Sequence, residues 1–229
     1  MYTSILGSLA LISLPWLHYL GIRKTILILI LFWIILFFLP RIRLYGKTIG
    51  IGILALSAVI LLASIFIIPP EVRQTVELQR RIADQGGLKV PKQIFVNKFV
   101  ESYKYREGLL FENLDFGNYF FSGHPRERGG VTEILKFWLA FLPLSVIGLI
   151  KVHSRVRWFL LSIGSLSIAA VVFLADRSIY ANLAITIPVA YFTAEGLIYL
   201  LKGRTEERVL LGLISLLFLF ELVTFYAEI

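Results

Sequence analysis

Long apolar runs separated by short polar breaks dominate this chain. Crossing a hydrocarbon core takes about 20 apolar residues in a helix, and each run approaches that length. The pattern therefore predicts an all-α fold, a polytopic transmembrane helix bundle of about seven spans. The first two spans form either a tight hairpin or a signal-anchor followed by a second helix. The predicted spans are roughly residues 5–22, 25–39, 48–68, 134–150, 158–174, 180–201 and 209–226.

One polar segment, residues 70–131, interrupts this pattern and divides the chain into an N-terminal membrane block (1–69), the segment itself and a C-terminal membrane block (132–229). Its first part, "PPEVRQTVELQRRIADQGG", predicts a helix, because proline favours a helix start and the Gly86-Gly87 pair a stop. A second helix is predicted over "PKQIFVNKFVESYKYREG". Its aromatic face either packs on the bundle or rests on the membrane surface; that face comprises Ile94, Phe95, Phe99 and Tyr103.

Composition supports a membrane protein. Hydrophobic residues make up 58% of the 229 residues, against about 45–50% in soluble domains. The chain has no cysteine, which excludes disulfides and cysteine-based zinc sites. The net charge of +8 fits basic loops at one membrane face better than nucleic-acid binding, because no long basic run is interleaved with aromatic residues.

Lysine and arginine in the short loops predict the orientation. With the N-terminus inside, the inner loops hold nine of these residues and the outer short loops three. Basic loops stay on the cytoplasmic side, so we expect the N-terminus inside and the C-terminus outside. Residues 70–131 would then lie outside.

Two features of the sequence resemble binding motifs without matching them. "YGKTIG" at 45–50 resembles a phosphate loop, but Arg41 stands where that motif needs glycine, and the stretch is interpreted as a charged inner loop. The three histidines, His18, His124 and His153, lie in different segments, so no metal site is expected, and no cofactor either.

Two carboxylates fall within predicted spans, where an ionisable group costs about 2.5–3.5 kcal/mol and is a functional candidate by default. Glu195 is either functional, as in a transporter, or reaches toward Lys202 or Arg204. Glu221 is equally open to a functional and a structural interpretation. Pro143 and Pro188 predict kinks.

The main candidate site is "ENLDFGNYFFSGHPRERGG" at 112–130. In an extended chain His124, Arg126 and Arg128 point to one side, and together they are suited to hold a phosphate. Glu112 and Asp115 lie three residues apart, share a face if helical, and are candidates for a catalytic base. The alternative is that the carboxylates only pair with neighbouring basic residues.

This segment and the span after it resemble polytopic GT-C glycosyltransferases of the dolichyl-phosphate-mannose mannosyltransferase and aminoarabinose transferase type. The resemblance rests on "NYFF" at 118–121, "GHPR" at 123–126 and Leu142-Pro143. A weaker match covers 176–201, with the marks Arg177, Tyr180, Pro188 and Gly196. It implies a bacterial or archaeal cytoplasmic membrane and a polyprenyl-phosphate-linked sugar as ligand.

The resemblance also implies a missing part. GT-C enzymes carry an acidic catalytic residue on a large first outer loop, whereas only Arg23 and Lys24 separate the first two predicted spans here. The chain resembles the later part of such an enzyme without its catalytic half. We therefore expect a protein that binds a lipid-linked phosphate or sugar, as an auxiliary or split-enzyme subunit. The alternatives are a compact glycosyltransferase and an assembly protein that docks a membrane protein partner through residues 70–131.

Overall fold

The computed structural model describes residues 2–15, 22–85, 98–115, 117–120, 136–175 and 183–227. Every regular element in these ranges is helical, which confirms the predicted all-α class. The helices are α1 (Tyr2–Ile12), α3 (Ile22–Phe37), α4 (Leu39–Ile65), α5 (Pro70–Gln85), α7 (Lys98–Leu114), α8 (Gly117–Phe120), α9 (Phe141–Lys151), α10 (Ser154–Leu174), the 3₁₀ turn η1 (Leu183–Ile185), α11 (Thr186–Lys202) and α12 (Thr205–Ala227).

The helices differ in their capacity to cross a membrane. In the described part of the chain, Leu39–Leu78 and Ser154–Leu174 are long and apolar enough to do so. The apolar helices α1 and α9 have only 11 residues each. At 1.5 Å per residue they extend about 16 Å, half of a hydrocarbon core. The structure therefore does not confirm the seven full-length spans that the pattern predicts.

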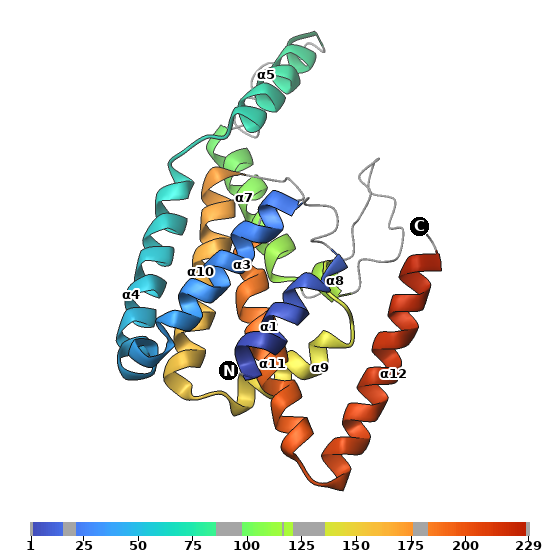
Figure 1. Cartoon of the computed structure of the whole chain (residues 1–229). Helices are drawn as coiled ribbons and strands as arrows, with labels where there is room; N and C mark the ends of the chain where they lie inside the picture. The colour runs from blue at the N-terminus through green and yellow to red at the C-terminus, as the bar shows by residue number, and fades with distance from the viewer. Residues whose placement is uncertain are drawn as a thin grey trace.

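Helices α4 and α10 form one of the two most extensive pairings in the bundle (Figure 1). A Cβ at Gly46 would lie 2.6 Å from the Arg155 carbonyl oxygen, and one at Gly50 3.1 Å from the Trp158 backbone. Glycines four residues apart let two helix backbones approach closely. The "YGKTIG" stretch is therefore part of α4 and its contact with α10, and its interpretation as a loop was wrong.

Helices α9 and α11 form the other extensive pairing, and their backbones touch. A Cβ at Gly148 would lie 1.9 Å from the Phe192 carbonyl oxygen, and one at Gly196 2.0 Å from that of Leu144. Beside this crossing, the Ser145 and Thr193 hydroxyl groups share a hydrogen bond of 2.8 Å. The crossing depends on glycine at both positions.

Two prolines predicted to kink helices instead lie near helix starts. Pro143 is the third residue of α9, and Pro188 the third of α11. The first turn of a helix tolerates proline because its N–H groups have no intrahelical acceptor.

Helices α5 and α7 stand at one end of the bundle, as Figure 1 shows, and α5 matches the predicted helix from its proline to the residue before Gly86. The second predicted helix is present as α7, but the predicted aromatic face is not its buried face. Phe99 and Tyr103 are exposed, whereas Ser102, Arg106 and Leu109 are buried. Ile94 and Phe95 lie outside the described residues.

Arg106 attaches α7 to the ends of α4 and α10. Its guanidinium donates to the carbonyl oxygens of Val172, Phe173 (3.1 Å) and Ile67 (2.8 Å). The Ser102 hydroxyl also donates to Ile67, at 3.2 Å. Burial lowers the pKa of the Arg106 side chain, because leaving water disfavours the charged form. The negative ends of two helix dipoles meet at this cation and favour it there.

The turns between α9 and α10 and between α11 and α12 lie at the opposite end of the bundle (Figure 1). The start of α4 lies there too, because the Arg155 guanidinium donates to the carbonyl oxygens of Arg43 and Leu44, both at 3.2 Å. Lys151 places its ammonium group 4.4 Å from the centre of the Tyr199 ring. Three basic segments thus gather at one end, away from α5 and α7.

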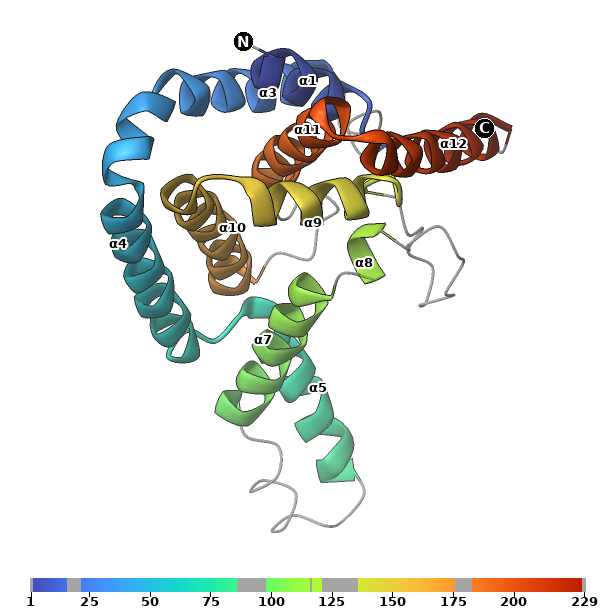
Figure 2. The ribbon, with the colours of Figure 1, turned by 90° about the horizontal axis from the view of Figure 1, so that it is seen from below.

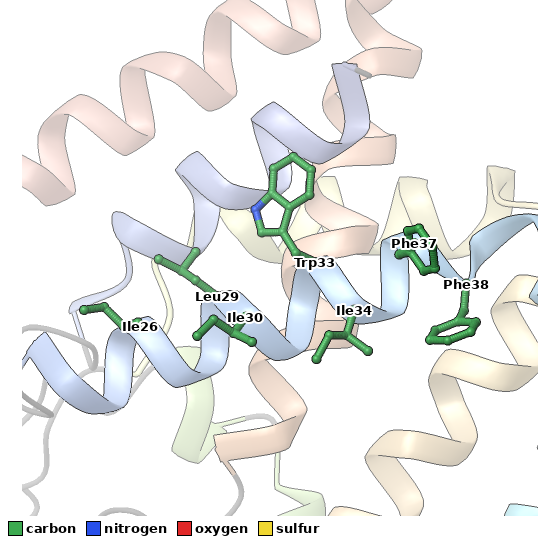
Figure 3. Close-up of a pocket in the computed structure, with 7 residues that line it drawn as sticks. All are labelled: Ile26, Leu29, Ile30, Trp33, Ile34, Phe37 and Phe38. Carbon is green, nitrogen blue, oxygen red and sulfur yellow. The ribbon is translucent and has the colours of Figure 1, made fainter.

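Apolar side chains cover the outer faces of the bundle. Along α12, Leu213 is 60% exposed and Phe220 70% exposed. Helix α3 buries only Ile28 and Phe32, and its other face borders an apolar groove of about 550 Å³ (Figure 3). The groove is lined by Ile26, Leu29, Ile30, Trp33, Ile34, Phe37 and Phe38. Water is a poor solvent for such surfaces.

Candidate functional site

The proposed catalytic carboxylates lie where α7 gives way to α8. Helix α7 ends at Leu114, so Asp115 lies just beyond it. The Gly117 N–H donates to the Asp115 Oδ1 at 2.8 Å, and this carboxylate therefore stabilises the start of α8. Glu112 is half-buried in the last turn of α7. Asp115 thus follows α7 directly and accepts a backbone hydrogen bond, and a role of Glu112 or Asp115 as base remains a prediction.

The chain leaves the described structure at Phe120 and returns at Lys136, and these two points lie together. The Phe137 N–H donates to the Tyr119 carbonyl oxygen at 3.0 Å, and the Phe137 and Phe120 ring centres are 5.3 Å apart. The Lys136 ammonium group lies 4.8 Å from the centre of the Tyr119 ring. We call this contact the α8 junction, formed by Tyr119, Phe120, Lys136 and Phe137. His124, Arg126 and Arg128 lie outside the described residues and fall between Phe120 and Lys136 in the sequence.

Buried aromatic contacts continue the α8 junction into the bundle. The Trp138 indole N–H donates to the Ser13 carbonyl oxygen, at the end of α1, at 2.7 Å. Phe218 of α12 meets Trp138 edge to face, with ring centres 5.7 Å apart, and stacks on Phe141. The junction is thus held by α1, α9 and α12 together.

Glu221 binds the backbone just before α9. Its two carboxylate oxygens accept hydrogen bonds from the N–H groups of Leu139 (2.6 Å) and Ala140 (2.9 Å). These groups precede the helix and have no carbonyl partner within it. A carboxylate also interacts favourably with a helix N-terminus. These contacts support the structural interpretation of Glu221, and a functional role stays a prediction.

Glu195 contacts α1 instead of the basic residues near its own helix end. The Thr3 hydroxyl donates to its Oε1 at 3.1 Å, and Tyr191, one turn earlier on α11, also shares a side-chain hydrogen bond with it. The predicted reach toward Lys202 or Arg204 was wrong. Like Glu221, this carboxylate holds the first turn of an 11-residue helix.

No group of metal-ligating side chains occurs in the described ranges. Comparisons with family models, curated proteins and solved structures find no match. The GT-C resemblance therefore stays an expectation that rests on the quoted motifs.

Arg106 was not singled out from the sequence. It lies in a helix rich in charge, where an arginine usually faces water. It does not belong to the aromatic face that the sequence predicts for this helix. The available signal was its spacing of four from Ser102 and three from Leu109, which places the three on one side of a helix.

Replacing Glu221 tests its structural role. We expect Glu221→Leu to lower the free energy of unfolding by about 2 kcal/mol, because two buried N–H groups lose their acceptor. Glu221→Gln retains one acceptor oxygen and should lose about half as much. Thermal unfolding in detergent provides the measurement, with the exposed Glu206→Gln on the same helix as control. A Leu variant as stable as this control would contradict the structural role.

Proposed function

We propose that this chain is an integral membrane protein that binds a lipid-linked phosphate or sugar at its outer face. Membrane integration is supported by the apolar outer surfaces of α3, α4 and α12, which include Trp33, Val59 and Leu216. Burial in lipid would stabilise these surfaces by about 25 cal/mol per Å². The shorter helices α1 and α9 enter the membrane only part of the way. Glu221 accepts from two backbone N–H groups just before α9, and Glu195 accepts from the Thr3 hydroxyl in the first turn of α1.

The orientation follows from the two ends of the bundle. Basic residues of α4, α9–α10 and α11–α12 gather at one end and α5–α7 at the other, so the positive-inside rule assigns the basic end to the cytoplasm. The N-terminus is then inside, while the C-terminus and residues 70–131 are outside. This orientation is compatible with seven membrane-associated helices, of which α1 and α9 are half-length: α1, α3, α4, α9, α10, α11 and α12.

Ligand binding is carried by one observation, the closed α8 junction. Phe120 and Phe137 are in contact, so the described chain stops and resumes at one place on the bundle. Holding the two ends of a segment together lowers the entropy lost when that segment binds a ligand. The three residues suited to phosphate, His124, Arg126 and Arg128, fall in the sequence between these two ends. Arginine offers a planar fork of donors that matches phosphate oxygens.

The proposed role is that of an auxiliary or split-enzyme subunit and does not require catalysis by this chain. In the GT-C enzymes that the motifs resemble, the catalytic acid lies on an earlier outer loop, for which the first two helices here leave no room. Asp115 already accepts a backbone hydrogen bond, so it has less freedom to act as a base.

Photo-crosslinking with a polyprenyl-phosphate probe tests ligand binding. We expect labelling of the purified protein in bilayers, and a loss of about tenfold or more in Arg126→Ala plus Arg128→Ala, because charge-assisted hydrogen bonds contribute about 1.5–3 kcal/mol each. The matched control is Arg73→Ala plus Lys104→Ala, two exposed basic residues of α5 and α7. Equal labelling of both double variants, or equal labelling by a polyprenol probe without phosphate, would count against the proposal.

A further inference from the structure

Helix α7 carries an exposed apolar stripe that the bundle does not use. We call it the α7 stripe. Its members recur at helical spacing, and among them Tyr103 is 53% and Phe111 61% exposed. The face that binds the bundle is a different one, formed by Ser102, Arg106 and Leu109. The α7 stripe consists of Val100, Tyr103, Phe111 and Leu114.

Arg106 fixes the position of α7 relative to the ends of α4 and α10. Its three carbonyl partners belong to the last residues of α10 and to Ile67, two residues beyond α4. In the described part of the chain, α4 and α10 belong to the two stretches that are long and apolar enough to cross a membrane. If they cross, their common end lies at the boundary between hydrocarbon and water, where aromatic side chains are enriched. Helix α7 is held at that depth.

The stripe also continues an apolar surface. At the end of α4, Leu62, Phe66 and Ile67 are exposed, directly beside the point where Ser102 and Arg106 bind. Figure 2 shows α5 and α7 extending sideways from the body of the bundle, over the area that lipid would occupy around it. An apolar face at this position meets lipid without any further partner.

We propose that the α7 stripe is immersed in the boundary between lipid headgroups and acyl chains, so that the membrane surface itself is its partner. Glu107, which falls within the stripe, is exposed, and its carboxylate would extend back to the hydrated headgroups. Side chains in such a position reach about 5–10 Å below the headgroups. The proposal rests on membrane integration, and it is independent of phosphate binding.

Spin labels at single cysteines test this depth, since the chain has no native cysteine. The protein is reconstituted in vesicles of phosphatidylcholine and phosphatidylglycerol, and collision with oxygen is compared with collision with a water-soluble nickel chelate. We expect labels at Tyr103→Cys and Phe111→Cys about 5–10 Å below the phosphate level. A label at Gln74→Cys, exposed on α5, should remain in water.

A label at Val59→Cys, on the exposed face of α4, separates the two proposals. It should lie deeper than both stripe labels. Nickel collisions at Val59 would refute membrane integration, and with it the basis of the inference. A deep Val59 label together with stripe labels as accessible to nickel as the Gln74 label would overturn the inference alone. Stripe labels shielded from both reagents would also overturn it, because a protein would then cover the stripe.

Discussion

Gly148→Ala is expected to disrupt the pairing of α9 with α11. The added Cβ would lie 1.9 Å from the Phe192 carbonyl oxygen, which belongs to rigid backbone. The helices must therefore separate by about 1 Å or more, at a cost of about 3 kcal/mol. The nearby hydrogen bond between Ser145 and Thr193 would be lost as well. Thermal unfolding in detergent should show a lower midpoint or loss of the monodisperse protein.

A double-mutant cycle makes this prediction specific. Gly196→Ala should cost about as much, because its Cβ would lie 2.0 Å from the Leu144 carbonyl oxygen. Both changes push the same helices apart, so the double variant should lose less than the two single losses together. Gly164→Ala and Gly212→Ala are the controls, since nothing lies within 4 Å of a Cβ at either position. They should be neutral or stabilising by up to about 1 kcal/mol. Additive losses in the double variant would contradict a shared crossing.

Arg106→Ala is the second change with a large expected effect. It removes the donor for three carbonyl oxygens, two in α10 and one just beyond α4. We expect a loss of about 3 kcal/mol, or roughly 6–12 °C in the unfolding midpoint. Limited proteolysis should cut the α5–α7 segment faster, because α7 loses its attachment to α4 and α10.

Two further variants define the role of this guanidinium. Arg106→Lys keeps the charge but not the planar fork, so its loss should be intermediate. The exposed Arg73→Ala on α5 removes an arginine without removing a buried contact, and should unfold like the unmodified protein. If Arg106→Ala unfolds at the same temperature and is cut at the same rate as Arg73→Ala, Arg106 does not hold α7.

Much of the fold follows from the sequence because apolar runs and helix punctuation are local signals. Helix α5 begins at its predicted proline and ends before Gly86 for this reason. The sequence did not show that α9 begins only at Phe141, because residues 136–140 are nearly as apolar as the helix that follows. Whether such a stretch is helical depends on the partners of its backbone, here Tyr119 and Glu221.

The candidate site was only partly predictable, because its contacts join distant parts of the chain. Glu221 and Ala140 are 81 positions apart, and Arg106 lies 66 from Val172. The sequence identifies a carboxylate that is costly within a membrane, but it does not identify the N–H groups that donate hydrogen bonds to that carboxylate. The same holds for the glycines at the helix crossings. The spacing of four between Gly46 and Gly50 in α4 is visible in the sequence, whereas the close approach of Gly148 to Gly196 arises only when α9 packs on α11.

The central claim is that this chain spans a membrane with its basic turns inside and α5–α7 outside. Single cysteines at Gln74 on α5 and Glu206 at the start of α12, both exposed, report the two sides without interference from native cysteines. With a membrane-impermeant maleimide, Gln74→Cys should react in intact cells, and Glu206→Cys only after permeabilisation. Reaction of both positions in intact cells, or of Glu206→Cys alone, would contradict the account.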